Sequence, residues 1–157
     1  MRLAVGSDKS GYSLKESVKE YLLSIGHEVE DLGLTDPEGF KAYYEVAPIV
    51  AKKVQGSETE KGLLFCGTGM GMAILANKFH GIYAAVVEGS YSARMCSVVN
   101  NANILTMGSW IVSPQMAIDM VDRWLNAKFT EGFPPERQEF LNNAFKNVKE
   151  IESQNFK

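Results

Sequence analysis

Short apolar runs alternate along the chain with longer stretches whose apolar residues recur at helical spacing. The short runs predict five strands, at residues 3–6, 28–32, 62–65, 82–87 and 103–107. Residues 28–32 alternate as an exposed edge strand does, whereas 3–6, 62–65 and 82–87 are typical of buried strands. The longer stretches predict helices at residues 13–24, 43–54, 91–99, 114–127 and 135–151, and an apolar helix that ends at residue 76.

Strands separated by helices predict an α/β fold with a five-stranded parallel sheet covered on both faces. Right-handed crossovers place the carboxyl end of every strand at one edge, where open α/β sheets bind ligands. The length of 157 residues indicates one domain, residues 1–157. The helix at 135–151 follows the complete α/β pattern. It packs either on its own domain or on a partner subunit, and the sequence leaves both arrangements open.

Composition narrows the function classes. Apolar residues make up 45% of the chain and the net charge is -3, which excludes a disordered chain and a basic nucleic-acid-binding surface. Two cysteines are too few for a disulfide scaffold or a thiolate zinc site, and His27 and His80 lie far apart, so we expect no metal. Without a signal-like or membrane-spanning apolar run, we expect a cytoplasmic protein with free thiols.

The most informative stretch is Cys66-Gly67-Thr68-Gly69-Met70-Gly71, at the end of a predicted strand. Three alternate glycines let the backbone turn tightly and direct successive N–H groups toward one anion or a developing oxyanion. The stretch lacks the Lys-Ser/Thr of a Walker loop and the Gly-x-Gly-x-x-Gly spacing of a dinucleotide site. It therefore favours an anion or oxyanion site over a nucleotide site.

The residues near this loop each allow a structural and a functional interpretation. At a helix start Cys66 is favoured as a thiolate, or it is a small buried apolar residue, whereas Cys96 inside a helix fills the core. Asp8 follows the first strand, and it caps the next helix or moves protons. Lys9 is a solvated or phosphate-contacting charge; a Schiff-base role requires burial.

The sequence resembles ribose-5-phosphate isomerase B and the galactose-6-phosphate isomerase subunits from Leu3 to about Arg137. The resemblance is carried by the Cys-Gly-Thr-Gly loop in combination with other short segments. These segments are Gly6-Ser7-Asp8-Lys9-Ser10-Gly11, residues 26–33, Ala76-Asn77-Lys78, Tyr91-Ser92-Ala93-Arg94, residues 100–103 and Trp124-Leu125.

The resemblance implies a Rossmann-like α/β/α sandwich, a homodimer or dimer of dimers, and no metal or cofactor. It implies that an aldose phosphate and its ketose interconvert through a cis-enediolate, with Cys66 as the base and Asp8 handling hydroxyl protons. Thr68 would hydrogen-bond the sugar. The amides of Gly67, Gly69 and Gly71 would hold the enediolate oxygen. Tyr43 and Asn100 would line the cleft, with some of these residues coming from the second subunit.

Four positions depart from the family pattern. Lys9 replaces a histidine, and Val99 replaces the histidine that opens the sugar ring. Trp110 and Phe133 replace two arginines, while the phosphate-binding arginine at Arg137 remains. Losing guanidinium groups removes bidentate phosphate recognition, and the aromatic rings supply an apolar wall for a sugar face.

These departures leave the substrate open. The family default is a ribose 5-phosphate type of sugar phosphate. Because Val99 cannot transfer a proton, a tetrose phosphate whose O4 is blocked, or an unphosphorylated sugar, is an alternative. A third possibility is a weakly active sugar-binding subunit of a hetero-oligomeric isomerase.

Overall fold

The computed structural model describes residues 1–156 and contains a five-stranded parallel sheet in the order β2-β1-β3-β5-β4. The strands are β1 (Arg2–Ser7), β2 (Glu28–Asp31), β3 (Lys61–Cys66), β4 (Ala84–Val86) and β5 (Ile104–Gly108). The helices are α1 (Tyr12–Ser24), α2 (Tyr43–Gln55), α3 (Met70–Ala76), α4 (Ser90–Asn100), α5 (Pro114–Asn126) and α6 (Pro135–Asn155).

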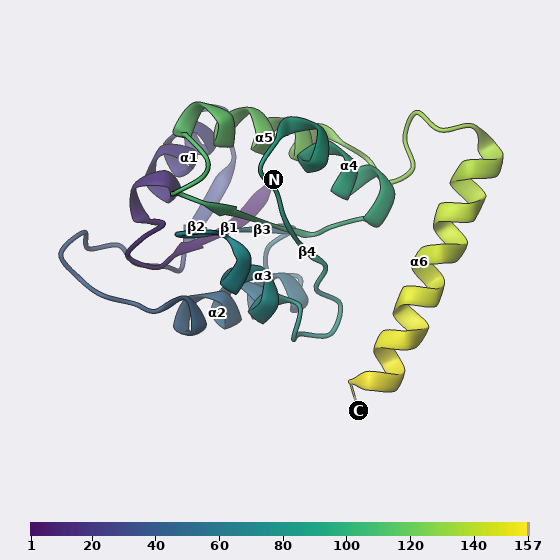
Figure 1. The fold of residues 1–157 in the computed structure, drawn as a ribbon, viewed down its shortest axis with the longest axis horizontal. Helices are drawn as coiled ribbons and strands as arrows, with labels where there is room; N and C mark the ends of the chain where they lie inside the picture. The colour runs from purple at the N-terminus through teal and green to yellow at the C-terminus, as the bar shows by residue number, and fades with distance from the viewer. Residues whose placement is uncertain (157) are drawn as a thin grey trace.

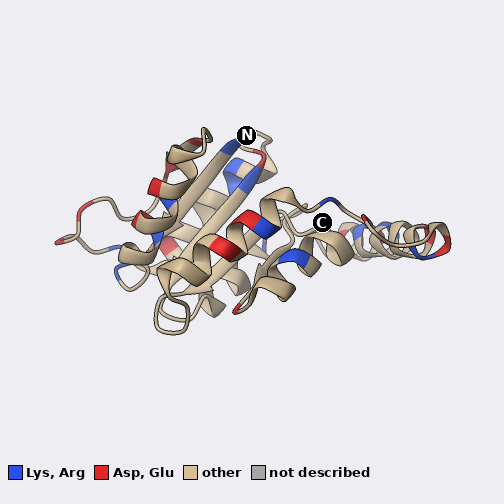
Figure 2. Ribbon diagram, turned by 90° about the horizontal axis from the view of Figure 1, so that it is seen from above, with Lys and Arg blue, Asp and Glu red and all other residues tan. Residues whose placement is uncertain are grey.

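Helices cover the sheet on both faces, which confirms the predicted three-layer α/β architecture. Helices α1, α4 and α5 lie on one face, and α2 and α3 lie on the other (Figure 1). Each face has its own apolar core. One is built around Phe65 and Trp124, and the other around Leu64 and Met72. Basic and acidic positions are interspersed over the helices (Figure 2), in keeping with the small net charge.

The strand predicted at residues 82–87 is shorter and less buried than its apolar run indicated. It forms only as Ala84–Val86 and pairs with β5 alone, so it ends the sheet as the second edge strand. Val86 is 36% exposed. The prediction of a buried strand was therefore wrong. An apolar run alone does not reveal whether a strand has one neighbouring strand or two.

Helix α6 stands beside the α/β body (Figure 1), and its carboxyl-terminal half is attached to the loop before β4. The Glu152 carboxylate accepts hydrogen bonds from the Gly81 N–H (2.6 Å) and the Tyr83 hydroxyl (2.8 Å). Leu141 is the buried residue of α6, whereas Val148 and Ile151 are exposed. No helix among residues 1–156 is long and apolar enough to span a bilayer.

Candidate active site

The carboxyl ends of β1 and β3 lie side by side, and this pairing places the two predicted loops together. Ser7 is in register with Phe65, so Asp8 and Cys66 follow at the same edge of the sheet. A cavity of about 270 Å³ opens at this edge. Its walls are formed by Asp8, Ser10, Tyr43, Cys66, Gly67, Thr68, Gly71 and Trp110.

The glycines of the loop are required by their surroundings. Gly69 has a φ of 78° and lies against the backbone of Met107, so a side chain there would be strained and obstructed. A Cβ on Gly67 would lie 2.7 Å from the Trp110 ring, and one on Gly71 would lie 2.9 Å from the Tyr43 ring. The two aromatic rings therefore pack directly on the loop, and both residues line the cavity.

Cys66 is 6% exposed and lies where β3 ends. Its Sγ accepts a hydrogen bond from the Gly69 N–H at 3.0 Å. A backbone donor at the sulfur stabilises a thiolate relative to a thiol. The Gly69 amide is thus directed at the sulfur in this structure. Within the loop, the Thr68 hydroxyl accepts from the Met70 N–H at 3.4 Å.

Asp8 supports the turn before α1 and also lies at the cavity. Its Oδ1 accepts the Gly11 N–H at 2.9 Å, which braces the turn before α1, and its side chain also lines the cavity. Burial raises the pKa of Asp8 above its ordinary value, although hydrogen bonds from the Gly11 and Ser10 backbone oppose the shift. A carboxyl group with a raised pKa is better suited to exchange protons near neutral pH.

Six predicted residues do not line this cavity, and one of them is Gly69, which lies within the loop itself. The Lys9 ammonium donates to the Pro37 carbonyl. Val99 and Asn100 line a separate, largely apolar cavity of about 320 Å³ with Cys96 and residues of α6. The Arg137 guanidinium stacks on two rings at the start of α6, 4.8 Å from the Phe140 centroid and 5.9 Å from that of Phe133.

Sequence reasoning gave Ser10 no role in the site, although it lines the cavity beside Asp8. Its place in the polar loop after β1 was the available signal. The residues described here hold no group of three metal-ligating side chains.

The fold and the cavity define an α/β enzyme with a cysteine and a glycine loop at the carboxyl edge of its sheet. The family model described as Ribose/Galactose Isomerase matches residues 3–142, so the chain belongs to this family. It is an enzyme of the aldose–ketose isomerase type.

Relatives within the family carry different names. The chain is 51% identical to the 4-deoxy-4-sulfo-D-erythrose isomerase of Clostridium sp. (strain MSTE9), over 97% of this chain and 96% of that one. It is 40% identical to the ribose-5-P isomerase B of Listeria innocua, over 84% and 88% of the two chains. Among solved structures, Clostridium thermocellum ribose-5-phosphate isomerase B superposes with a TM-score of 0.89 at 38% identity, covering 98% and 99% of the chains.

Proposed function

We propose that this enzyme isomerises an open-chain four-carbon aldose that carries an anionic group at C4, with Cys66 as the base. The observation that supports this choice of substrate is the valine at position 99. Its side chain is apolar and stands where the family resemblance expects the residue that opens a sugar ring. A tetrose closes its ring through O4. A sulfonate or phosphate group at C4 leaves no free O4, so the substrate needs no ring-opening residue.

The arrangement at Cys66 supports the proton transfer. The thiolate removes the proton from C2 of the aldose, and the electrons of that C–H bond form the cis-enediolate. The proton returns at C1, while a hydroxyl proton passes from O2 to O1. The Gly69 N–H stabilises the thiolate through its 3.0 Å hydrogen bond. Asp8, whose pKa burial raises, is suited to carry the hydroxyl proton.

The walls of the cavity favour a compact substrate with a single terminal anion. Trp110 offers an aromatic face where the family pattern has an arginine near the loop, and the Tyr43 ring lies against Gly71. A sulfonate carries one negative charge and needs fewer guanidinium groups than a phosphate dianion. The relative that is 51% identical is named for such a sulfonated tetrose.

A second copy of the chain completes the site in this proposal. Asn100 and Arg137 do not line the Cys66 cavity of their own chain, and α6 leaves Phe140, Val148 and Ile151 exposed. Mixing Cys66→Ala with Arg137→Ala chains tests this. If each site takes Cys66 from one chain and Arg137 from the other, half of the randomly reassorted dimers contain one chain of each variant. Each of these mixed dimers has one intact site of two, so the mixture regains about a quarter of wild-type activity. A mixture that stays as inactive as its parents contradicts a shared site.

Proton exchange at C2 in deuterated water tests the substrate. The panel is 4-deoxy-4-sulfo-D-erythrose, D-erythrose 4-phosphate, D-ribose 5-phosphate and unsubstituted D-erythrose. We expect kcat/KM for one of the two C4-anionic tetroses to exceed that for ribose 5-phosphate by at least about tenfold. Faster exchange of ribose 5-phosphate contradicts the choice of substrate. Absence of turnover with every sugar indicates a binding subunit instead.

A further inference from the structure

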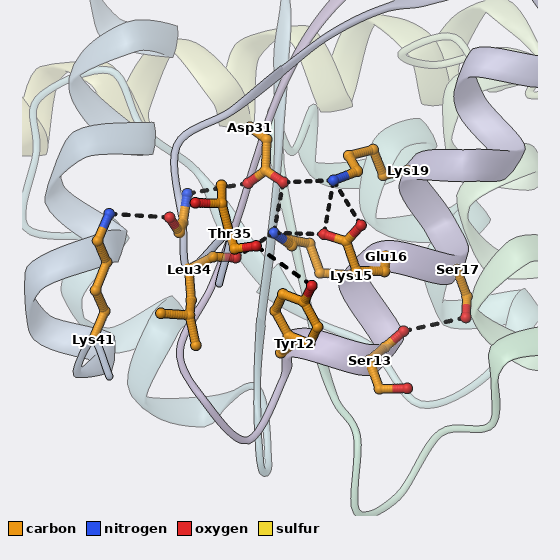
Figure 3. A network of polar contacts seen from close by, with 11 residues as sticks. Tyr12, Ser13, Lys15, Glu16, Ser17, Lys19, Asp31, Leu34, Thr35 and Lys41 are labelled. Atoms are coloured by element: carbon orange, nitrogen blue, oxygen red, sulfur yellow. Dashed lines mark hydrogen bonds and ion pairs between the residues drawn. The ribbon is translucent and has the colours of Figure 1, made fainter. Parts of the chain in front are cut away.

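Lys15 of α1 is a fully buried lysine outside the cavity. Its Nζ lies 2.6 Å from Asp31 Oδ2 and 2.9 Å from Glu16 Oε1, and it donates to the Leu34 carbonyl at 2.5 Å (Figure 3). Burying a lysine is costly unless its charge is paired and its N–H groups are satisfied. Here three acceptors surround the ammonium group.

The charges around Lys15 balance. Lys19 contacts the same two carboxylates, at 2.7 Å from Glu16 and 2.9 Å from Asp31 (Figure 3). The cluster therefore holds two cations and two anions. The difference between the lysines is that Lys15 alone also binds a backbone carbonyl of the loop after β2.

That loop, residues 32–42, runs over the end of β1 beside the cavity. The Leu34 N–H donates to the Ser7 carbonyl at 2.9 Å, one residue before Asp8. A Cβ on Gly33 would lie 2.2 Å from the Ser7 nitrogen, so the two backbones are in direct contact. The loop lacks regular structure, and side chains supply hydrogen bonds to its carbonyls, including Lys41 to Gly33 at 3.0 Å.

The other end of the loop leads directly to Tyr43. The Glu45 carboxylate accepts the Ala42 N–H at 2.7 Å, which ends the loop and begins α2. Tyr43 is the first residue of α2, and its ring lies against Gly71 as a wall of the cavity. The loop therefore connects the Leu34 carbonyl to the first residue of α2.

We propose that Lys15 is a positioning residue for the active site. By holding the Leu34 carbonyl from the interior, it keeps the loop against β1 and so places Tyr43 over the glycine loop and beside Cys66. Lys19 shares the ion cluster without binding the loop, and it is the matched control. A kinetic test of this proposal rests on the proposed function, because it needs a substrate. A second test, by chemical modification of Cys66, needs no substrate.

The chemical test measures alkylation of Cys66 by iodoacetamide, in which the thiolate displaces iodide. Peptide mass spectrometry follows Cys66 and Cys96 in the same sample, so Cys96 reports global unfolding. We expect Lys15→Met to accelerate alkylation of Cys66 at least about fivefold with Cys96 unchanged, and Lys19→Met to leave both rates within about twofold. Equal acceleration of both cysteines, or equal effects of the two variants, overturns the proposal.

The kinetic test is a double-mutant cycle on the best substrate of the panel. If Lys15 acts through Tyr43, Lys15→Met raises KM strongly in the wild-type background and only slightly in the Tyr43→Ala background. Additive effects overturn the proposal, even if the enzyme is an isomerase. If Lys15→Met does not fold, it is combined with Asp31→Asn, which removes the carboxylate that the lost ammonium would leave unpaired. The double variant is then compared with Asp31→Asn alone, with the same directions expected, and equal Cys66 alkylation rates in the two overturn the proposal.

Discussion

The two cysteines occupy opposite kinds of backbone environment. Cys66 ends β3, and its sulfur accepts the Gly69 N–H at 3.0 Å. Cys96 lies within α4, and its S–H donates to the Ala93 carbonyl at 3.2 Å. A donor stabilises a thiolate and an acceptor stabilises a thiol. The two sulfurs therefore face opposite ends of a peptide group, an N–H at Cys66 and a carbonyl at Cys96.

The surroundings reinforce this difference. Burial raises the pKa of Cys96 to about 11, with the nearby charge of Lys61 opposing the shift. Cys96 shares its apolar cavity with Val99 and Phe145. Cys66 instead shares its cavity with Asp8, Ser10 and the glycine loop. One thiol lies at a cavity with a carboxyl group and a hydroxyl group, and the other packs among apolar side chains.

The largest expected effect is the loss of kcat when Cys66 is replaced. Cys66→Ala should lower kcat at least about a thousandfold, because the proposed base is lost. Cys96→Ala should retain kcat within about threefold. Exchange of the C2 proton measured by NMR checks both. Comparable losses in the two variants would show that the contrast between the thiols is unrelated to catalysis.

Alkylation rates against pH sharpen the contrast without a substrate. The thiolate fraction of Cys96 rises tenfold per pH unit below its pKa of about 11. Its alkylation rate should therefore rise about a hundredfold between pH 8 and pH 10. A Cys96 rate that changes little over this range would contradict this interpretation.

The Val99→His variant tests whether the cavity lined by Cys96, Val99 and Asn100 can take part in ring opening. An imidazole beside Asn100 supplies the proton donor and acceptor that valine lacks. If a second copy brings this region to Cys66, kcat/KM for ribose 5-phosphate should rise about tenfold, with little change for a C4-anionic tetrose. Val99→Leu serves as the apolar control. No gain with ribose 5-phosphate would argue that this region stays apart from the site.

The smallest effect concerns the ion cluster behind the Cys66 cavity. Burial raises the pKa of Asp31, but hydrogen bonds from Lys15 and Lys19 outweigh it, and the pKa lies below the ordinary 3.8. The resulting stabilisation is complete above that ordinary value and is lost as pH falls through the lowered pKa. Between pH 5 and pH 2, wild type should lose about 1 kcal/mol more stability than Asp31→Asn. Urea unfolding measures this, and equal losses would contradict it.

Predictions from sequence succeeded where the signal is local. The apolar patterns placed the strands and helices, and Pro37 and Gly39 marked the loop at residues 35–42, which the structure leaves without regular structure. The edge position of β4 was missed because it depends on strand order. Lys15 showed no signal at all. It occupies one position in an amphipathic helix, and only the packing of residues 31–34 against α1 makes it interior.

The sequence by itself determined the α/β order of elements and the glycine loop after a strand that ends in a cysteine, because these depend on residues a few positions apart. Tertiary structure decided that Tyr43 and Trp110 stand on Gly71 and Gly67. It also decided that Asn100 and Arg137 lie away from the Cys66 cavity of their own chain. These contacts join segments tens of residues apart, whose meeting depends on the packing of the whole sheet.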